Sequence, residues 1–352
     1  MTRRLAAVFG ARPWLVAAAL TVVSYAVIGP WGNFPLNDDW TFSRVALKLV
    51  QNGRFFVDVP SGPSLVIQSY ASAPFIMLFG FSHLMVRMLT MVLGFVGLWA
   101  VGSLLESAQV APWLRAVAVT LVAFNPLYMY LSASFMTELW GHVPALLGVV
   151  LWFRGRARAK EGGPAIPLHY ALGSAALISA TFWTRQYASF AFPAVWASSL
   201  LHLLYRRSFK ELKATAPAFG LTAALFVAVV AAYFPWAKAT GNFRPEFAMP
   251  LDELKRFDGP MLVLQTCIAS FYMTAFFLPA LLLFRWGTRV PRLLAFAAVG
   301  VVLVGGAYYA MRVAEAAGIS NAKPADVHHK VMPFDGNVLY NAGIGPLTLK
   351  DA

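Results

Sequence analysis

The sequence predicts an all-α, polytopic helical membrane protein. Hydrophobic residues make up 59% of the 352 residues, and charged residues make up only 12%. The mean hydropathy is +0.64, and apolar runs of about 18 residues or more, the length that lets a helix cross a bilayer, recur along the chain. The runs are continuous, whereas barrel strands would alternate apolar and polar residues.

About nine membrane-spanning helices are predicted from these runs. They cover residues 13–30, 84–105, 114–132, 139–153, 168–184, 187–205, 215–236, 260–284 and 292–311. The first run follows Arg3, Arg4 and Arg12 and lacks a small-residue cleavage site before Pro30. We therefore interpret it as an uncleaved span rather than a signal peptide.

The charge distribution predicts the orientation of the chain. If residues 64–80 stay outside the bilayer, the inner loops hold 15 of the 28 Lys and Arg residues but only three of the 15 Asp and Glu residues. Cytoplasmic loops carry such an excess of basic residues. We therefore expect a multi-pass protein of the cytoplasmic membrane with its N-terminus inside and residues 64–80 as an interfacial helix. The net charge of +13 follows from these loops, so it does not indicate a nucleic-acid partner.

The predicted division of the chain is a transmembrane module, residues 1–311, followed by a polar outer tail, residues 312–352. The module contains a long outer loop, residues 31–83. The tail has no closing span, so we interpret the chain as a truncated relative of a longer protein. A single cysteine, Cys267, excludes an internal disulfide and a cysteine metal cluster.

The outer loop opens on an acidic pair, Asp38 and Asp39. After it, Phe42 and further apolar residues recur at helical spacing until Gly53, which predicts an amphipathic helix at the membrane interface. Two interpretations of the pair stand side by side. Its carboxylates cap this helix and complement its dipole, or they carry out acid–base chemistry.

Glu138 lies at the predicted outer end of the third or fourth span, and His142 follows one helical turn later. The two side chains share a helix face and are weak candidates for metal ligands, because two ligands do not define a site. The alternative is that Glu138 caps the span while His142 forms a hydrogen bond inside the bundle.

Arg87 and Arg185 are predicted near outer span ends, where cations need an anionic partner. Lipid phosphate is such a partner, and ordinary contact with headgroups is the alternative. No carboxylate falls in the middle of a predicted span, which argues against an ion-coupled transporter.

The order of these motifs resembles the C-type membrane glycosyltransferases. The acidic pair leads into Trp40-Thr41-Phe42-Ser43-Arg44-Val45-Ala46 and then Gly53-Arg54-Phe55. Phe79-Gly80-Phe81-Ser82 precedes Arg87, and Glu138 and Thr184-Arg185-Gln186 follow. The similar members are the dolichyl-phosphate-mannose protein mannosyltransferases and the bacterial lipid A aminoarabinose transferase. The resemblance covers residues 13–190.

The resemblance implies a transferase that takes a sugar from a polyprenyl-phosphate donor on the outer face. The acceptor would be a hydroxyl of a glycan, lipid or protein. Asp38 matches the catalytic aspartate, Asp39 replaces the usual glutamate, and Glu138 matches a second acidic position. Asp38 would act as the general base with inversion at the sugar, and Arg87 and Arg185 would bind the donor phosphate.

One departure from the family bears on cofactors. The aminoarabinose enzyme has a charged Glu-Lys-Pro sequence tied to metal binding, whereas this chain has Ser61-Gly62-Pro63. No cofactor is therefore firmly implied, and a divalent metal is doubtful. Two non-catalytic alternatives are a transporter or flippase of lipid-linked glycans and an accessory subunit of a glycan assembly complex.

Overall fold

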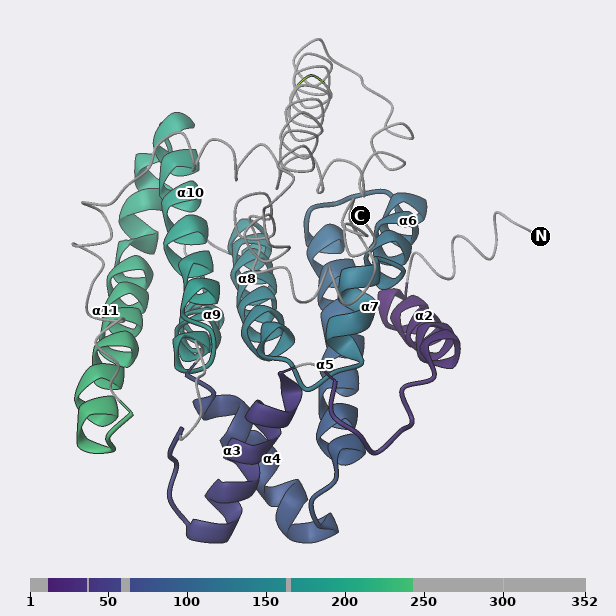
Figure 1. Ribbon diagram of the computed structural model, residues 1–352. Helices are drawn as coiled ribbons and strands as arrows, with labels where there is room; N and C mark the ends of the chain where they lie inside the picture. The colour runs from purple at the N-terminus through teal and green to yellow at the C-terminus, as the bar shows by residue number, and fades with distance from the viewer. Residues whose placement is uncertain (1–11, 37, 58–63, 163–165, 243–299, 301–352) are drawn as a thin grey trace, which may run out of the picture. The chain divides into compact units, whose positions relative to one another are not determined.

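The structure is a computed structural model, and it describes residues 12–36, 38–57, 64–162, 166–242 and 300 (Figure 1). The chain divides into two compact units, one made of residues 1–124 and 131–244, the other of residues 125–130 and 245–352. The described residues are helical and contain no strand. The predicted tail, residues 312–352, lies outside them.

Helices lie over most of each of the first seven predicted spans, and the third, residues 114–132, is divided between two helices. In chain order the elements are α2 (Pro13–Ile28), α3 (Asp39–Asn52), α4 (Val66–Phe79), α5 (His83–Ser107), α6 (Pro112–Ala123), α7 (Pro126–Ser132), α8 (Thr137–Gly162), α9 (Leu168–Ala180), the 3-10 helices η1 (Thr181–Trp183) and η2 (Gln186–Phe190), α10 (Ala191–Tyr205) and α11 (Phe209–Ala239).

Several of these helices are suited to a membrane. Three are long and apolar enough to cross one: His83–Ser107, Gln186–Tyr205 and Phe209–Ala239. The pair Pro112–Ala123 and Pro126–Ser132 adds a fourth if it forms one span. The chain is therefore an all-α membrane protein with three or four candidate spans among its described residues. The predicted number of nine is not confirmed, and the last two predicted spans lie outside the described residues.

The predicted amphipathic helix is present as α3. Phe42, Val45, Ala46 and Leu49 are buried on one of its faces. Gly53 ends the helix with φ +65°, a left-handed conformation that glycine adopts without the penalty of a Cβ atom. The segment predicted at the interface is also helical, as α4, and it packs against α3.

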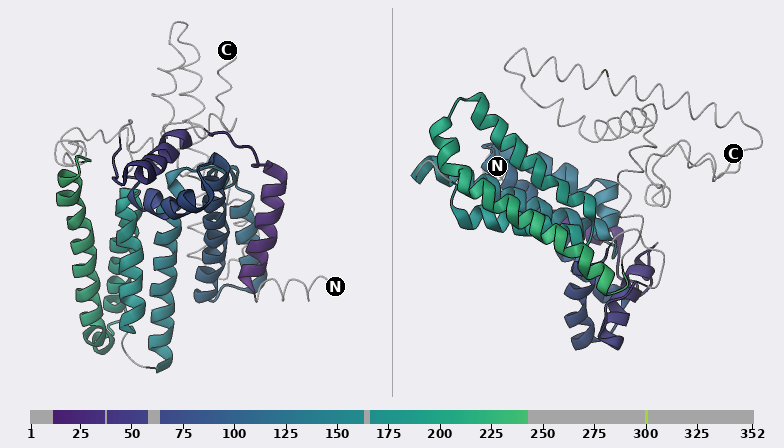
Figure 2. Two further views of the ribbon diagram at one scale, coloured as in Figure 1. Left: turned by 90° about the horizontal axis from the view of Figure 1, so that it is seen from below. Right: turned by 90° about the vertical axis from the view of Figure 1, so that its left-hand side faces the viewer.

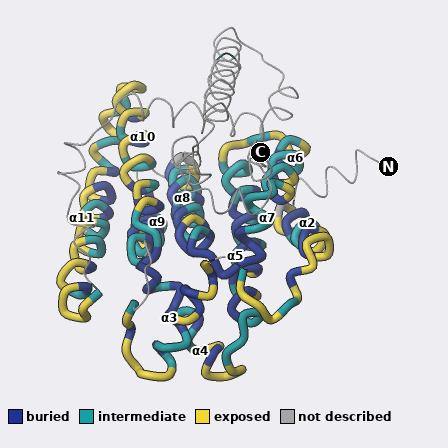
Figure 3. Tube along the Cα trace, viewed as in Figure 1, coloured by how far each residue is buried: buried dark blue, intermediate teal, exposed yellow. Residues whose placement is uncertain are grey.

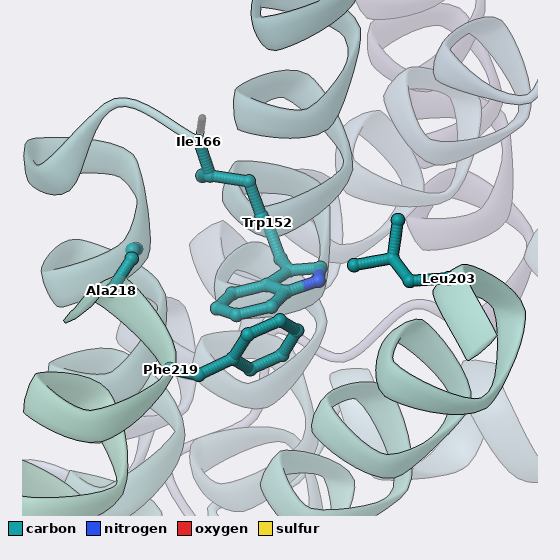
Figure 4. Packing of buried hydrophobic residues seen from close by; sticks show 6 residues of the cluster. Trp152, Ile166, Leu203, Ala218 and Phe219 are labelled. Atoms are coloured by element: carbon teal, nitrogen blue, oxygen red, sulfur yellow. The ribbon is translucent and has the colours of Figure 1, made fainter. Parts of the chain in front are cut away.

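The bundle core forms where α8 and α9 meet α10 and α11. Trp152 is 1% exposed and packs with Phe219, with a ring-centroid separation of 5.5 Å (Figure 4). Its indole Nε1 donates to Ser199 Oγ over 2.8 Å. The residues of this cluster are Trp152, Ile166, Ala171, Leu203, Ala218 and Phe219. A buried indole N–H needs such an acceptor, so the bond fixes the orientation of the ring.

The helices α3 and α4 lie together at one end of the bundle (Figures 1 and 2). Asn242, three residues after the end of α11, holds them there: it accepts from the Val57 N–H over 3.0 Å and donates to the Phe55 carbonyl over 3.2 Å. The Phe55 ring also contacts Trp236 of α11, with a centroid separation of 5.6 Å. In Figure 3, α3 and α4 carry buried positions as well as exposed ones at this end.

Candidate functional site

Asp38 occupies the N-cap position of α3 and is exposed. Its carbonyl accepts the Thr41 N–H over 3.0 Å, but its side chain makes no capping hydrogen bond. The capping interpretation of the acidic pair therefore does not describe the carboxylate of Asp38. This carboxylate lies at the surface, where it can meet a substrate.

Asp39 is 2% exposed, and both of its carboxylate oxygens accept backbone hydrogen bonds. Leu36 N–H donates to Oδ1 over 2.5 Å, and Phe135 N–H donates to Oδ2 over 3.4 Å. Burial raises the pKa of Asp39 to about 6, although the two backbone donors and the charge of Arg87 oppose this rise. Asp39 is thus placed to hold the loop that contains Phe135, between Ser132 and Thr137, against α3. We call this segment the Phe135 loop.

Arg87 is fully buried near the start of α5. Its Nη1 donates to the carbonyls of Pro30 and Gly32 over 2.8 and 2.9 Å, and its Nη2 donates to the Phe34 carbonyl over 2.5 Å. The guanidinium also lies 5.3 Å from the centre of the Phe34 ring. Both terminal nitrogens are therefore occupied by the segment that leads to the acidic pair, and contact with phosphate stays a prediction.

The backbone of Phe135 is held at both its N–H and its carbonyl. Asp39 accepts its N–H, and the Nε2 of Gln68 in α4 donates to its carbonyl over 2.9 Å. Gln68 is fully buried. Because α8 begins at Thr137, this pair of bonds connects α3 and α4 to the start of the helix that carries Glu138.

Glu138 and Arg185 form an ion pair at this end of the bundle. The side chains are 17% and 22% exposed, so the pair is only partly screened by solvent. Gly141 allows the approach of the two segments, because a Cβ atom there would lie 2.7 Å from the Cβ of Arg185. The predicted second acid and the predicted phosphate ligand are therefore in direct contact.

The predicted metal pair is not assembled into a ligand set. His142 Nδ1 lies 2.7 Å from the backbone carbonyl of Glu138, and the His142 ring lies 5.4 Å from that of Tyr187. Over the described ranges, no group of three or more His, Cys, Asp or Glu side chains is placed to hold a metal ion. His142 is exposed and its hydrogen-bond contact is with the carbonyl one turn earlier in its own helix, so the predicted hydrogen bond inside the bundle does not describe it either.

Residues 182–186, which include Arg185 of the ion pair, connect to the start of α4. Ser64 N–H donates to the Thr184 carbonyl over 3.1 Å, and Gln186 Nε2 donates to Ser64 Oγ over 2.5 Å. Several buried polar atoms nearby have no protein partner: Gln68 Oε1, Ser69 Oγ, Thr137 Oγ1, Glu138 Oε2, Thr184 Oγ1 and Arg185 Nε. Buried polar groups normally bond to protein or water, so this region has unused hydrogen-bonding capacity.

Sequence reasoning missed Gln68 and Gly141 as residues that shape the site. A buried glutamine in an apolar helix was a usable signal, since such a side chain needs a partner. The backbone of Phe135 gave no signal, because peptide groups are alike in every sequence. Comparisons with protein-family models, curated proteins and solved structures found no match to this chain.

Proposed function

We propose that the chain is an integral membrane glycosyltransferase that moves a sugar from a polyprenyl-phosphate donor to an acceptor hydroxyl. One observation carries the proposal: hydrogen bonds and an ion pair connect Asp39, the Phe135 loop, Glu138 and Arg185 at one end of the bundle. Asp38 is exposed next to Asp39. An exposed base beside a paired acid and arginine suits the transfer of a sugar from phosphate.

The proposed reaction uses Asp38 as the general base. Asp38 takes the proton of the acceptor hydroxyl as that oxygen attacks the anomeric carbon. The carbon–oxygen bond to the donor phosphate breaks with inversion, and polyprenyl phosphate leaves with the electron pair. Negative charge grows on the phosphate, so a cation that contacts it lowers the barrier.

We assign this phosphate contact to Arg185 rather than to Arg87. Arg185 is partly exposed and pairs with Glu138 through Nη2, whereas Arg87 is fully buried and both of its terminal nitrogens bond to backbone carbonyls. When phosphate binds, Arg185 exchanges part of its pairing with Glu138 for the new anion. Arg87 then acts as a positioning residue that shapes residues 30–34.

The proposed setting is the outer face of a cytoplasmic membrane. The helices α3 and α4 lie at the end that the basic-residue count predicts to be outside, and the apolar prenyl chain would remain in the lipid. The partners are a polyprenyl-phosphate-linked sugar, membrane lipid and a glycan, lipid or protein acceptor. The chemistry above requires no metal ion.

The test is transfer from a panel of radiolabelled polyprenyl-phosphate sugars by the purified protein in lipid. We expect Asp38→Asn to lower the transfer rate by about 10²–10⁴-fold, the usual contribution of a general base, without a change in melting temperature. Wild-type rates in the variant would refute the role of Asp38.

A binding measurement with polyprenyl phosphate, the product common to all such donors, completes the test. Arg185→Gln should weaken this binding, and Lys238→Gln, which removes an exposed cation from the end of α11, serves as the control. A wild-type protein that neither binds polyprenyl phosphate nor transfers any sugar would overturn the proposed function and favour a non-catalytic subunit.

A further inference from the structure

The turn between α10 and α11 lies at a membrane surface, because it joins two candidate spans. The first span ends at Tyr205 and the second begins at Phe209. Only three residues separate them, so the turn is too short to leave the interface. It lies at the opposite end of the bundle from α3 (Figures 1 and 2).

This turn concentrates exposed positive charge. Arg206, Arg207, Lys210 and Lys213 are all exposed. The acidic residue within the same stretch is Glu211, so the stretch keeps an excess of three positive charges. We call these four cations the basic turn.

Large apolar side chains around the basic turn are exposed as well. Tyr205 is 89% exposed and Phe209 is 65% exposed, and Leu201 and Leu204 are exposed on the preceding turns of α10. Apolar side chains beside cations match the chemistry of the lipid interface, where acyl chains meet charged headgroups.

A further arginine from α8 extends the charge into the bundle. Arg156 Nη1 contacts Ser199 Oγ at 3.4 Å, the same hydroxyl that accepts the Trp152 indole N–H. Ser199 is buried in α10, seven residues before Arg206. Arg156 thus contacts the helix that leads into the basic turn.

We propose that the basic turn, together with Arg156, binds the headgroups of anionic phospholipids. A juxtamembrane group of four or more Lys and Arg residues attracts anionic lipid, at about 1 kcal/mol for each cation near the surface. The exposed apolar side chains fit the acyl chains of the same lipid, which free phosphate lacks. The inference does not depend on the proposed transferase activity.

The backbone at Arg207 allows a substitution that does not strain the turn: Arg207 has φ +52°, a conformation that favours glycine. Arg207→Gly removes one charge and relieves this strain, so melting temperature should hold or rise. Anionic-lipid binding should fall by about fivefold, the equivalent of one cation.

The decisive experiment compares two variants with equal changes in charge. Arg206→Gln/Lys210→Gln removes two cations of the basic turn, and Arg54→Gln/Lys238→Gln removes two exposed cations elsewhere. Each protein is placed in nanodiscs of phosphatidylcholine with or without phosphatidylglycerol. Binding is measured as the amount of lipid that the protein retains. We expect about 30-fold weaker retention of phosphatidylglycerol in the first variant and wild-type retention in the second.

Two results would overturn the proposal. One is equal retention of phosphatidylglycerol by both variants and the wild type. The other is equal stabilisation of the wild type by inorganic phosphate and by phosphatidylglycerol, which would make the surface a general anion site. Loss of binding at high salt, with retention at low salt, is the expected behaviour of exposed charges.

Discussion

Asp38 and Asp39 are neighbours in sequence but have opposite environments. Asp38 is exposed at the N-cap, whereas Asp39 is 2% exposed and accepts two backbone N–H groups. Successive residues at a helix start point in directions about 100° apart, so one faces solvent while the other faces the core. The pair therefore places one carboxylate at the surface and the other in the core, where it accepts backbone hydrogen bonds.

A pH-dependent stability follows from the environment of Asp39. Its pKa rises from 3.8 to about 6 on folding, so the folded state binds the proton more tightly than the unfolded state. The contribution of Asp39 to the free energy of unfolding is therefore largest below pH 3.8 and is lost as the pH rises through about 6. At about 1.4 kcal/mol per pKa unit, the change is on the order of 3 kcal/mol.

We expect Asp39→Asn to flatten the dependence of melting temperature on pH between about pH 4 and pH 7. Asp38→Asn is the matched control, because an exposed carboxylate lacks the burial that raises the pKa of Asp39. The measurement is thermal unfolding in detergent across that range. If the dependence of melting temperature on pH in Asp39→Asn has the wild-type slope, burial does not raise the pKa of Asp39.

At the scale of elements, α3 and α4 hold the residue that leads into α8. Asp39 of α3 accepts the Phe135 N–H and Gln68 of α4 donates to the Phe135 carbonyl, two residues before the helix begins. Glu138 in the first turn of α8 then meets Arg185. The position of the second acid thus depends on helices that are distant from it in sequence.

We expect Gln68→Ala to destabilise the protein by about 2 kcal/mol, because the carbonyl of Phe135 loses its donor and a buried side chain leaves a cavity. Ser72→Ala is the control on the same helix: Ser72 is also fully buried, but its hydroxyl bonds to the Gln68 carbonyl within α4. Thermal unfolding of both variants measures the difference.

Combining Gln68→Ala with Asp39→Asn tests whether the two side chains act together on Phe135. Groups that share a partner give coupling energies of about 0.5–3 kcal/mol, whereas independent sites add. We expect the double variant to depart from additivity by that amount. Purely additive changes in the free energy of unfolding would show that the two bonds work independently.

At the scale of the whole molecule, the described bundle has two chemically different ends. One end carries the acidic pair, Glu138 and Arg185, and the other carries the basic turn (Figure 1). The helix α11 runs between them with 31 residues, which is about 46 Å at 1.5 Å per residue. This length exceeds the hydrocarbon thickness of about 30 Å, so the two ends can lie on opposite membrane faces.

This arrangement predicts opposite accessibility for cysteines placed at the two ends. In a Cys267→Ser background, Asn52→Cys should react with a membrane-impermeant maleimide in intact cells. Arg207→Cys should react only after the membrane is permeabilised, because basic loops stay in the cytoplasm. Labelling of both positions from the same side would contradict the predicted orientation.

Local sequence patterns predicted the elements better than the contacts between them. The amphipathic spacing of Phe42 and Leu49 and the stop at Gly53 predicted α3, because both signals act within one helix. The role of Arg87 was harder to predict: a buried cation needs oxygen partners, but the sequence does not say which. Its partners here are carbonyls of residues 30–34, more than 50 positions away.

By itself, the sequence determined that the chain is helical, that several helices suit a membrane and where the first seven predicted spans form helices. These properties depend on hydropathy and on the spacing of nearby residues, and both can be read directly from the sequence. Only the tertiary structure decided that Asp39 is buried while Asp38 is exposed, that Glu138 pairs with Arg185 and that Gln68 holds Phe135. Such contacts depend on which helices meet, and that is decided by packing in three dimensions.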